Sequence, residues 1–290
     1  MIAIYIILAS VCVLLALWLF LIAPGSKRGM EKYRYVKYAH RGLHGTVGAD
    51  TYAAENSLTA FRRAKEYGFG IELDVRLTKD GELVVFHDNT LDRVTNGKGE
   101  VIEHTLAELR ELSLSGTEDT VPTLDEVLEL IDGAVPLLVE LKENGTDNSV
   151  GKKCAERLKT YGGDYIVESF SPMPFGEVRR VLPDVPCGFL ADKLTENERF
   201  RTLKYKIVES FLLNCVARPA FIAVNHKRPR MFPLPLIRAL FSVPTIAWTV
   251  RSAEEEKTAY ENGFDSVIFE GYMPDGTGAP GGQASDHKEK

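Results

Sequence analysis

Residues 135–169 read VPLLVELKENGTDNSVGKKCAERLKTYGGDYIVES. An apolar run at 135–141 is followed by a helix-like stretch at 148–161 and by a second apolar run at 165–169. A strand, a helix of this length and another strand in succession predict a parallel βαβ unit. This stretch therefore indicates an α/β fold.

The same alternation continues on both sides of this unit. Further strands are predicted at 35–39, 71–75, 187–190, 221–225, 244–250 and 266–269. Helices are predicted at 57–68, 123–131, 172–182, 197–217, 233–241 and 253–262. A short extra strand at 83–86 follows a hairpin-type turn. Without it the principal strands number eight, which favours a closed TIM (β/α)₈ barrel over an open sheet.

Two segments depart from this rhythm. Residues 88–122 are polar and rich in turns, which predicts a small inserted segment. On a TIM barrel, such loops build the active-site face. From residue 274 onward Gly, Asp and Lys dominate, which is typical of disorder. We therefore expect a barrel over 35–272, an insertion at about 88–122 and a disordered tail at 273–290.

The N-terminal segment is apolar throughout. Residues 2–23 carry no charge, and as a helix they would rise roughly 33 Å, enough to cross a bilayer core. A signal peptide normally opens with positive charge and ends in a small-x-small cleavage site, and neither feature is found here. We therefore expect one transmembrane helix, an uncleaved anchor, at residues 1–24.

A basic juxtamembrane linker at residues 25–34 follows the anchor and contains Lys27, Arg28, Lys32 and Arg34. The positive-inside rule places this flank in the cytoplasm. Four scattered cysteines without a Cys-x-x-Cys pair agree with a reducing compartment. A single-pass membrane protein with a cytoplasmic barrel is the expected arrangement.

Composition bounds the possible partners. Apolar residues make up 44% of the chain and charged residues 26%, as in ordinary globular proteins, so bulk disorder is excluded. The formal net charge is −6, whereas broad nucleic-acid binding needs a basic surface. We expect no nucleic-acid partner, although a basic pocket for a phosphate-bearing substrate remains compatible with this charge.

Ionisable residues collect at the ends of the predicted strands. Since the C-terminal ends of parallel barrel strands face one rim, we expect their side chains to meet there. Any one of them alone is more often a solvated charge or an ion-pair partner, but their conjunction favours a functional site. These residues are His40, Arg41, Glu72, Asp74, His87, Glu140 and Lys142.

The spacing of the acids points to a metal. Residues i and i+2 of a strand face the same side, so Glu72 and Asp74 share a face, as do Glu140 and Lys142. Carboxylates crowded inside a barrel repel one another and need a positive partner. Three carboxylates together with waters suit a hard divalent metal, Mg²⁺ or Ca²⁺.

The pattern as a whole resembles the glycerophosphodiester phosphodiesterase family. The resemblance extends over about residues 37–270 and includes the stretch at 89–95. It implies a TIM barrel with an inserted segment and hydrolysis of glycerophosphodiesters to glycerol 3-phosphate and an alcohol. The motifs that carry it are His40-Arg41-Gly42, Glu55-Asn56, Glu72-x-Asp74, His87-Asp88 and Glu140-x-Lys142.

The resemblance also implies roles for individual residues. Glu72, Asp74 and Glu140 are expected to hold the divalent metal, and Glu55 matches a further acid of the family that lies near it.

His40 and His87 are implied as the acid/base pair, and Arg41 and Lys142 as the groups that bind the phosphate. Which histidine is the acid stays open, as does the nucleophile, which is either water or the neighbouring glycerol hydroxyl. Trp248 occupies a position where the family often has an aromatic residue, and it either lines the pocket or packs in the core.

Two departures from the family pattern lie late in the chain. Arg251 stands where the family usually has Asn, and Glu270 follows Phe269 where a Thr-Asp pair is usual. Both positions lie on the rim where the alcohol part of the substrate would sit, so substrate preference stays open.

Two other functions compete with this one. A membrane-associated lysophospholipase D or phospholipase would use the same barrel on a lysolipid substrate that lies close to the anchor. A non-catalytic binding protein on an inactivated barrel would have lost a catalytic histidine or a metal acid, and none is missing.

Overall fold

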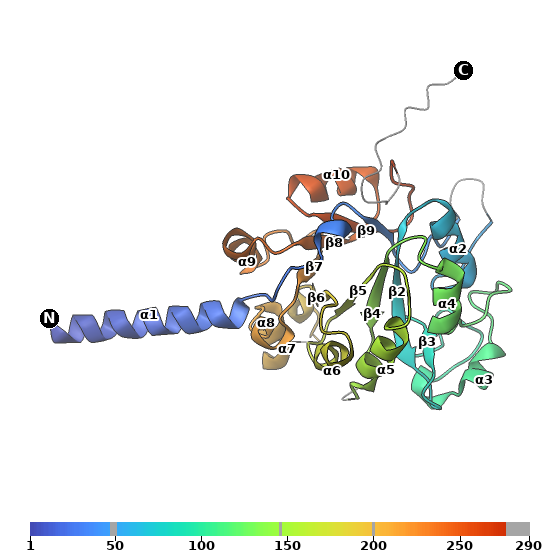
Figure 1. Ribbon diagram of the computed structural model, residues 1–290, viewed down its shortest axis with the longest axis horizontal. Coiled ribbons are helices and arrows are strands. Elements are labelled where there is room, and N and C mark those ends of the chain that lie inside the picture. The colour runs from blue at the N-terminus through green and yellow to red at the C-terminus, as the bar shows by residue number, and fades with distance from the viewer. Residues whose placement is uncertain (47–50, 145–146, 199–200, 277–290) are drawn as a thin grey trace, which may run out of the picture.

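The computed structural model describes residues 1–46, 51–144, 147–198 and 201–276. Eight parallel strands form a closed barrel, because β1 pairs with β2 on one side and with β9 on the other (Figure 1). This confirms the predicted TIM barrel. The strands are β1 Lys37–Ala39, β2 Gly70–Leu77, β4 Leu137–Leu141, β5 Tyr165–Ser169, β6 Cys187–Ala191, β7 Phe221–Asn225, β8 Thr245–Val250 and β9 Ser266–Phe269.

Helices cover the outside of the barrel (Figure 1). Several begin at side-chain caps that the sequence provides: Ser57 accepts from the backbone of α2, and Thr123 forms a capping box with Glu126 in α4. The helices are α2 Leu58–Glu66, α4 Leu124–Ile131, α5 Ser149–Leu158, α6 Pro174–Val181, α7 Leu203–Glu209, α8 Asn214–Ala217, α9 Leu234–Phe241 and α10 Ala253–Glu261.

The single helix predicted at 197–217 is wrong. The structure divides this stretch into α7 and α8, and Phe211 between them has a φ of 57°. Phe211 is fully buried, and its ring packs edge-on against Phe189 of β6 at 6.4 Å. The break between the helices directs the Phe211 ring into the core. Tertiary packing therefore overrides the helical propensity of this stretch.

β2 extends further along the chain than predicted and is followed by the short antiparallel strand β3, Leu83–Val85. The backbone N–H of Phe86 donates to the carbonyl of Asp74 at 2.8 Å. β2 therefore extends past the barrel rim and β3 runs back to it. This places His87, which follows β3, close to Asp74 of β2.

Residues 86–122 fold against the barrel as a segment with its own apolar core. It contains a short 3₁₀ turn, Val101–Glu103, and α3, Leu106–Arg110. Its buried side chains, together with neighbours from the barrel, are Ala54, Val84, Phe86, Leu91, Val94, Val101, Leu109, Leu114 and Val121. This packing fixes the loop that follows His87.

α1, Ile2–Ile22, projects away from the barrel (Figure 1). Its apolar window has a mean hydropathy of 2.8 and none of it is buried, so by length and composition this helix is able to cross a membrane. Its last residue, Ile22, is fully buried, and its carbonyl accepts a hydrogen bond from Asn214 of α8 at 2.8 Å. The tail predicted at 273–290 lies mostly outside the described residues.

Candidate active site

A cavity of about 300 Å³ opens at the barrel rim. It is lined by most of the residues that the sequence singles out, from strands that are far apart along the chain. Those in its wall are His40, Arg41, Glu72, His87, Glu140, Lys142 and Trp248. The structure thus brings together the two histidines, the two cations and the aromatic residue expected there.

Three carboxylates meet at the base of this cavity. Asp74 of β2 lies in register with Glu140 of β4, and Glu72 follows on the same face of β2. Oxygen atoms of the three lie within 4.8 Å of one another, and all three side chains are buried. Burial and mutual repulsion raise the pKa of Glu72 well above its usual value and that of Glu140 to about 7.

The donor set of this cluster fits a hard divalent cation. All three side chains are carboxylates, and burial together with mutual repulsion raises the pKa of Glu72 and Glu140. A cation bound by oxygen ligands would relieve that repulsion. Glu72, Asp74 and Glu140 are therefore the residues that could hold a metal here.

Lys142 and Arg41 supply part of the positive charge. Nζ of Lys142 lies 3.0 Å from Asp74 Oδ1 and 2.5 Å from Glu140 Oε1. The guanidinium Nε of Arg41 lies 3.5 Å from Asp74, and its backbone N–H donates to Glu72 at 2.8 Å. Burial opposes ionisation of Asp74, but Lys142, His87 and Arg41 outweigh it and hold its pKa well below the usual value.

The turn that carries Arg41 depends on a glycine. Arg41 and Gly42 have φ values of 55° and 78°, in the left-handed region that glycine adopts most easily. A Cβ on Gly42 would lie 2.9 Å from backbone and side-chain atoms of Ala60 and from the ring of Phe61, both in α2. The turn therefore packs directly on α2.

Glu55 lies outside the three-carboxylate cluster. Its Oε1 accepts hydrogen bonds from Arg41 at 2.7 Å and from Arg93 at 2.7 Å, and its Oε2 accepts another from Arg93 at 2.8 Å. Burial opposes its ionisation, but these guanidinium groups lower its pKa. The structure thus joins Glu55 to two arginines and not to the other acids.

Each histidine is oriented by a carboxylate. Nδ1 of His40 lies 2.8 Å from Glu270 Oε2, and Nδ1 of His87 lies 2.6 Å from Asp88 Oδ1. A carboxylate partner fixes the proton on Nδ1 and leaves Nε2 free to exchange protons. Burial lowers the pKa of both rings, that of His87 to about 4, so both are neutral near pH 7.

Arg93 and Arg76 hold the His87 loop in place. Arg93 donates to Asp88 from Nε at 2.6 Å and also binds Glu55, so it joins the inserted segment to the loop after β1. Arg76 of β2 donates to the backbone carbonyl of His87 at 2.6 Å and 3.0 Å.

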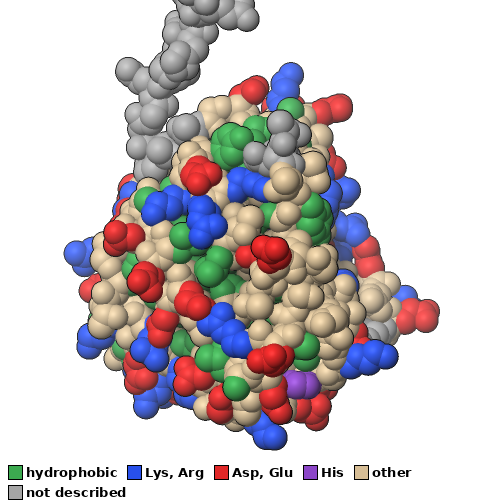
Figure 2. All heavy atoms as spheres, turned by 90° about the vertical axis from the view of Figure 1, so that its right-hand side faces the viewer, with side chains coloured by type: hydrophobic (Ala, Val, Ile, Leu, Met, Phe, Trp, Pro, Cys, Tyr) green, Lys and Arg blue, Asp and Glu red, His purple; other side chains and the backbone are tan. Residues whose placement is uncertain are grey.

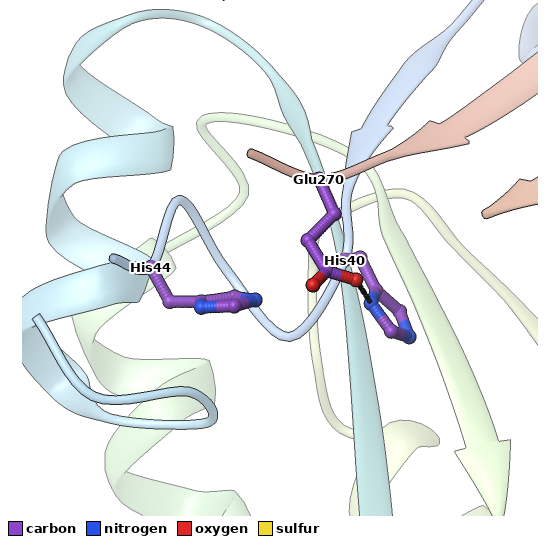
Figure 3. Close-up of side chains that lie close together, drawn as sticks. All are labelled: His40, His44 and Glu270. Carbon is purple, nitrogen blue, oxygen red and sulfur yellow. Dashed lines mark hydrogen bonds and ion pairs between the residues drawn. The ribbon is translucent and has the colours of Figure 1, made fainter. Parts of the chain in front are cut away.

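The two departures noted at Arg251 and Glu270 form an ion pair, with Nη2 of Arg251 3.0 Å from Glu270 Oε2. Hydrogen bonding from His40 is the largest influence on Glu270 and lowers its pKa to about 2. Figure 3 shows the Glu270 carboxylate between the rings of His40 and His44. Nε2 of His44 is buried without a hydrogen-bond partner within the described chain.

Trp248 of β8 lines the cavity and packs on another aromatic ring. Its indole meets Phe170 edge-to-face, with ring centroids 5.6 Å apart and an interplanar angle of 89°. Trp248 thus both lines the cavity and packs against the buried residues inside the barrel.

Sequence reasoning missed two polar side chains at the base of the site. Asn56 donates from Nδ2 to Asp74 Oδ2 at 2.8 Å and is buried, and only its place beside Glu55 gave a signal. Glu168 of β5 lies in register with Glu140, and burial raises its pKa well above the usual value. Nothing in the local sequence distinguished Glu168 from a strand-edge carboxylate.

A second hollow of about 650 Å³ adjoins the cavity and shares Glu140, Lys142 and Phe170 with it. Much of its wall is apolar. The apolar side chains that line it are Leu141, Phe170, Pro172, Met173, Leu194, Val208 and Leu213.

Comparisons with known proteins agree with this geometry. The model of the "Glycerophosphoryl diester phosphodiesterase family" matches residues 40–271. A glycerophosphodiester phosphodiesterase of Caldanaerobacter subterraneus is 39% identical over 163 residues, which span 52% of this chain and 65% of that protein. One from Bacillus subtilis is 28% identical over 253 residues, which span 78% of this chain and 83% of that protein.

Solved structures show the same fold. A phosphodiesterase of Oleispira antarctica, in complex with the product sn-glycerol-3-phosphate, superposes with a TM-score of 0.66 at 24% identity, covering 82% of this chain and 93% of that one. A glycerophosphodiester phosphodiesterase of Thermotoga maritima superposes with a TM-score of 0.59 at 25% identity, covering 81% of this chain and 94% of that one.

Proposed function

The chain is an enzyme of the glycerophosphoryl diester phosphodiesterase family, and from that premise we propose that it hydrolyses glycerophosphodiesters to glycerol 3-phosphate and an alcohol. The observation that carries the proposal is a cavity lined by two histidines, each hydrogen-bonded to a carboxylate, with three buried acids clustered at its base. The product named for the Oleispira antarctica relative supports the same substrate class.

Glu72, Asp74 and Glu140 are the proposed metal ligands, and Mg²⁺ or Ca²⁺ suits their oxygen atoms. A bound cation supplies neutralisation of the phosphodiester charge and polarisation of its P–O bonds. The contacts of Glu55 favour a different part for that residue: it holds the guanidinium of Arg41 in the cavity wall.

Arg41 and Lys142 are the proposed phosphate-binding residues. Both line the cavity, and acids surround each of them, so both remain charged. For each side chain burial opposes the charge, but Asp74 and a second carboxylate outweigh that effect and raise the pKa. Their positive charge is aimed at a phosphate whose negative charge grows in the transition state.

His40 and His87 are the proposed acid/base pair. One takes a proton from the attacking hydroxyl and the other returns a proton to the leaving alkoxide. Both rings begin neutral near pH 7, so the acid must gain its proton as substrate binds. The phosphate anion favours that protonation because opposite charges raise the pKa of imidazole.

We also propose that α1 anchors the enzyme in a membrane with the barrel on the cytoplasmic side. The length and apolar composition of α1 support this, as do Lys27 and Arg28 directly after it. A signal sequence would give the same apolar helix, so retention of residues 1–24 in the mature protein is the distinguishing observation.

A second candidate activity, lysophospholipase D, has one observation in its favour. The apolar hollow beside the cavity could take an acyl chain that a water-soluble glycerophosphodiester lacks. The phosphodiester chemistry and the leaving alcohol would be unchanged, and only the glycerol part that keeps the phosphate would differ, because it carries an acyl chain.

One assay tests both candidates. Full-length protein in detergent, supplied with Mg²⁺ or Ca²⁺, is offered glycerophosphocholine and lysophosphatidylcholine. We expect release of glycerol 3-phosphate from the first substrate, and loss of roughly 100-fold or more of the rate in His40→Ala and in His87→Ala. Chelation with EDTA should abolish turnover until the metal is returned.

His104 is the matched control, because it lies on the inserted segment away from the cavity. His104→Ala should keep full activity. Near-normal turnover in His40→Ala or His87→Ala would overturn the acid/base assignment, and choline release from lysophosphatidylcholine alone would favour the second activity.

A further inference from the structure

A basic cavity of about 720 Å³ lies outside the barrel mouth, beside α7 and the connection from β7 to α9. Phosphodiester hydrolysis does not use it, since none of the proposed catalytic or metal residues lines it. Its cationic residues come from three separate segments of the chain. They are Lys193, Lys206, Lys227, Arg228 and Arg230.

The positive charge of this cavity is only partly neutralised. Lys193 and Arg228 both pair with Glu196. The Lys206 ammonium and the Arg230 guanidinium have no acidic partner among the residues that the structure describes. Two cations thus face the cavity with their charge available to a ligand.

Glu209 is the acidic residue of the cavity wall, and it is already engaged. Its carboxylate accepts hydrogen bonds from the backbone N–H and the hydroxyl of Thr195. An anion that enters the cavity would therefore contact Lys206 and Arg230. The carboxylate of Glu209, which also lines the cavity, is hydrogen-bonded to Thr195.

The cavity wall is joined to the base of α1. Phe232, which lines the cavity, is 68% exposed, and its ring stacks on Trp18 of α1 with centroids 5.8 Å apart. In a helix that crosses a bilayer, a tryptophan near the end lies at the interface with the lipid headgroups. The cations of the cavity then lie at the level of the lipid phosphates.

We propose that this cavity binds the phosphate of an anionic phospholipid in the leaflet from which α1 emerges, and so docks the barrel on the membrane. The proposal rests on the membrane anchoring proposed above and not on the hydrolytic activity. Juxtamembrane Lys and Arg residues attract anionic lipid in this way.

The charge distribution over the molecule supports this orientation. The chain carries a formal net charge of −6, so an anionic leaflet repels the molecule as a whole. Figure 2 shows the face opposite α1, where acidic and basic side chains are mixed. Lys27 and Arg28 follow α1 in the sequence and add positive charge to the linker that leaves this helix.

Docking here would also place the apolar hollow near the lipid surface. α7 separates the two: Lys206 faces the basic cavity, whereas Tyr205 and Val208 line the hollow that adjoins the active site. One helix would therefore contact the membrane and border the route to the catalytic cavity.

The test uses the full chain in lipid nanodiscs made from phosphatidylcholine alone or mixed with phosphatidylglycerol. Hydrogen exchange of the amides at 203–210 and 227–232 reports docking. We expect slower exchange only with the anionic lipid. In K206Q/R230Q the docking equilibrium should fall roughly 30-fold, because each cation near the surface contributes about a fivefold change.

K152Q/K159Q is the matched control, since it removes one exposed lysine from α5 and another directly after it, away from α1 (Figure 1). It should dock like the unchanged chain, and both variants should hydrolyse a soluble glycerophosphodiester normally in detergent. Equal exchange in the two lipids, or no effect of K206Q/R230Q, would overturn the proposal. Protection by inorganic phosphate in phosphatidylcholine discs would overturn it in favour of a free-phosphate site.

Failure of the anchor gives a different result. If the full chain is washed from membranes at alkaline pH, both the anchor and this docking are overturned, whereas hydrolysis of the soluble substrate is unaffected. Failure of the hydrolase assignment would leave the lipid-dependent exchange in place.

Discussion

Glu270 contacts two positively polarised groups, since its Oε2 lies 2.8 Å from Nδ1 of His40 and 3.0 Å from Arg251. It lies behind the imidazole of His40, a proposed acid/base residue, and not in the wall of the cavity, so we treat it as a positioning residue. In Glu270→Gln the ring of His40 loses its orienting charge, and we expect kcat to fall roughly 10- to 100-fold while KM changes little.

The pH profile separates this role from a structural one. Glu270 raises the pKa of His40 against the lowering effect of burial, so its removal lowers that pKa further. The limb of the kcat profile that reports His40 should therefore move to lower pH. Glu261→Gln, an exposed carboxylate on α10, is the control. A uniform loss of rate at every pH would argue against positioning.

At this scale the sequence predicted which residues meet and not how they contact one another. The strand-end rule was enough to gather His40, Glu72, Asp74, His87, and Glu140. Contacts between distant segments carry no local pattern: Arg93 reaches Glu55 across 38 residues and Glu270 reaches His40 across 230. Only the closed barrel brings such pairs together.

At the scale of elements, the packing of the β1–α2 turn on α2 can be tested with two glycines. Gly42 and Gly45 have nearly the same φ, 78° and 79°, so alanine strains both backbones by roughly 1 kcal/mol. Only at Gly42 would the new Cβ meet α2, at 2.9 Å, while nothing lies within 4 Å of it at Gly45.

Gly42→Ala should therefore lower the free energy of unfolding by about 1–3 kcal/mol more than Gly45→Ala does, as for other overpacked sites. It should also lower the rate, because Arg41 precedes the strained residue. Chemical denaturation of both variants measures the difference. Equal losses in the two variants would show that backbone strain alone is responsible.

Local patterns predicted the elements where packing and pattern agree. The expected strands at 165–169, 221–225 and 266–269 have the same bounds in the structure. The prediction of one helix at 197–217 failed because the chain turns at Phe211, whose ring is buried in the core. The apolar helical pattern of the sequence does not indicate this turn. The hairpin strand before His87 was predicted, but the continuation of β2 to Leu77, beyond the expected 71–75, was not.

At the scale of the whole molecule, the acids of the site link stability to pH and to metal. Burial raises the pKa of Glu72 and Glu140 in the folded chain. Above the unfolded pKa of 4.5 the unfolded chain releases protons that the folded chain still holds, so stability falls as the pH rises towards about 7. Asp74 has a lowered pKa, so its effect lies at more acidic pH.

We therefore expect metal-free protein to lose stability between about pH 4.5 and pH 7, by on the order of 3 kcal/mol from Glu140, since one pKa unit corresponds to about 1.4 kcal/mol. Mg²⁺ or Ca²⁺ binds the ionised carboxylates, so the loss should shrink or vanish when metal is present. Calorimetric Tm values across this range, with EDTA or with metal, measure both effects. Glu140→Gln should remove its share of the metal-free slope and leave the share of Glu72, whereas Glu261→Gln should leave the slope unchanged. Parallel slopes with and without metal would mean that the three carboxylates do not form the metal site.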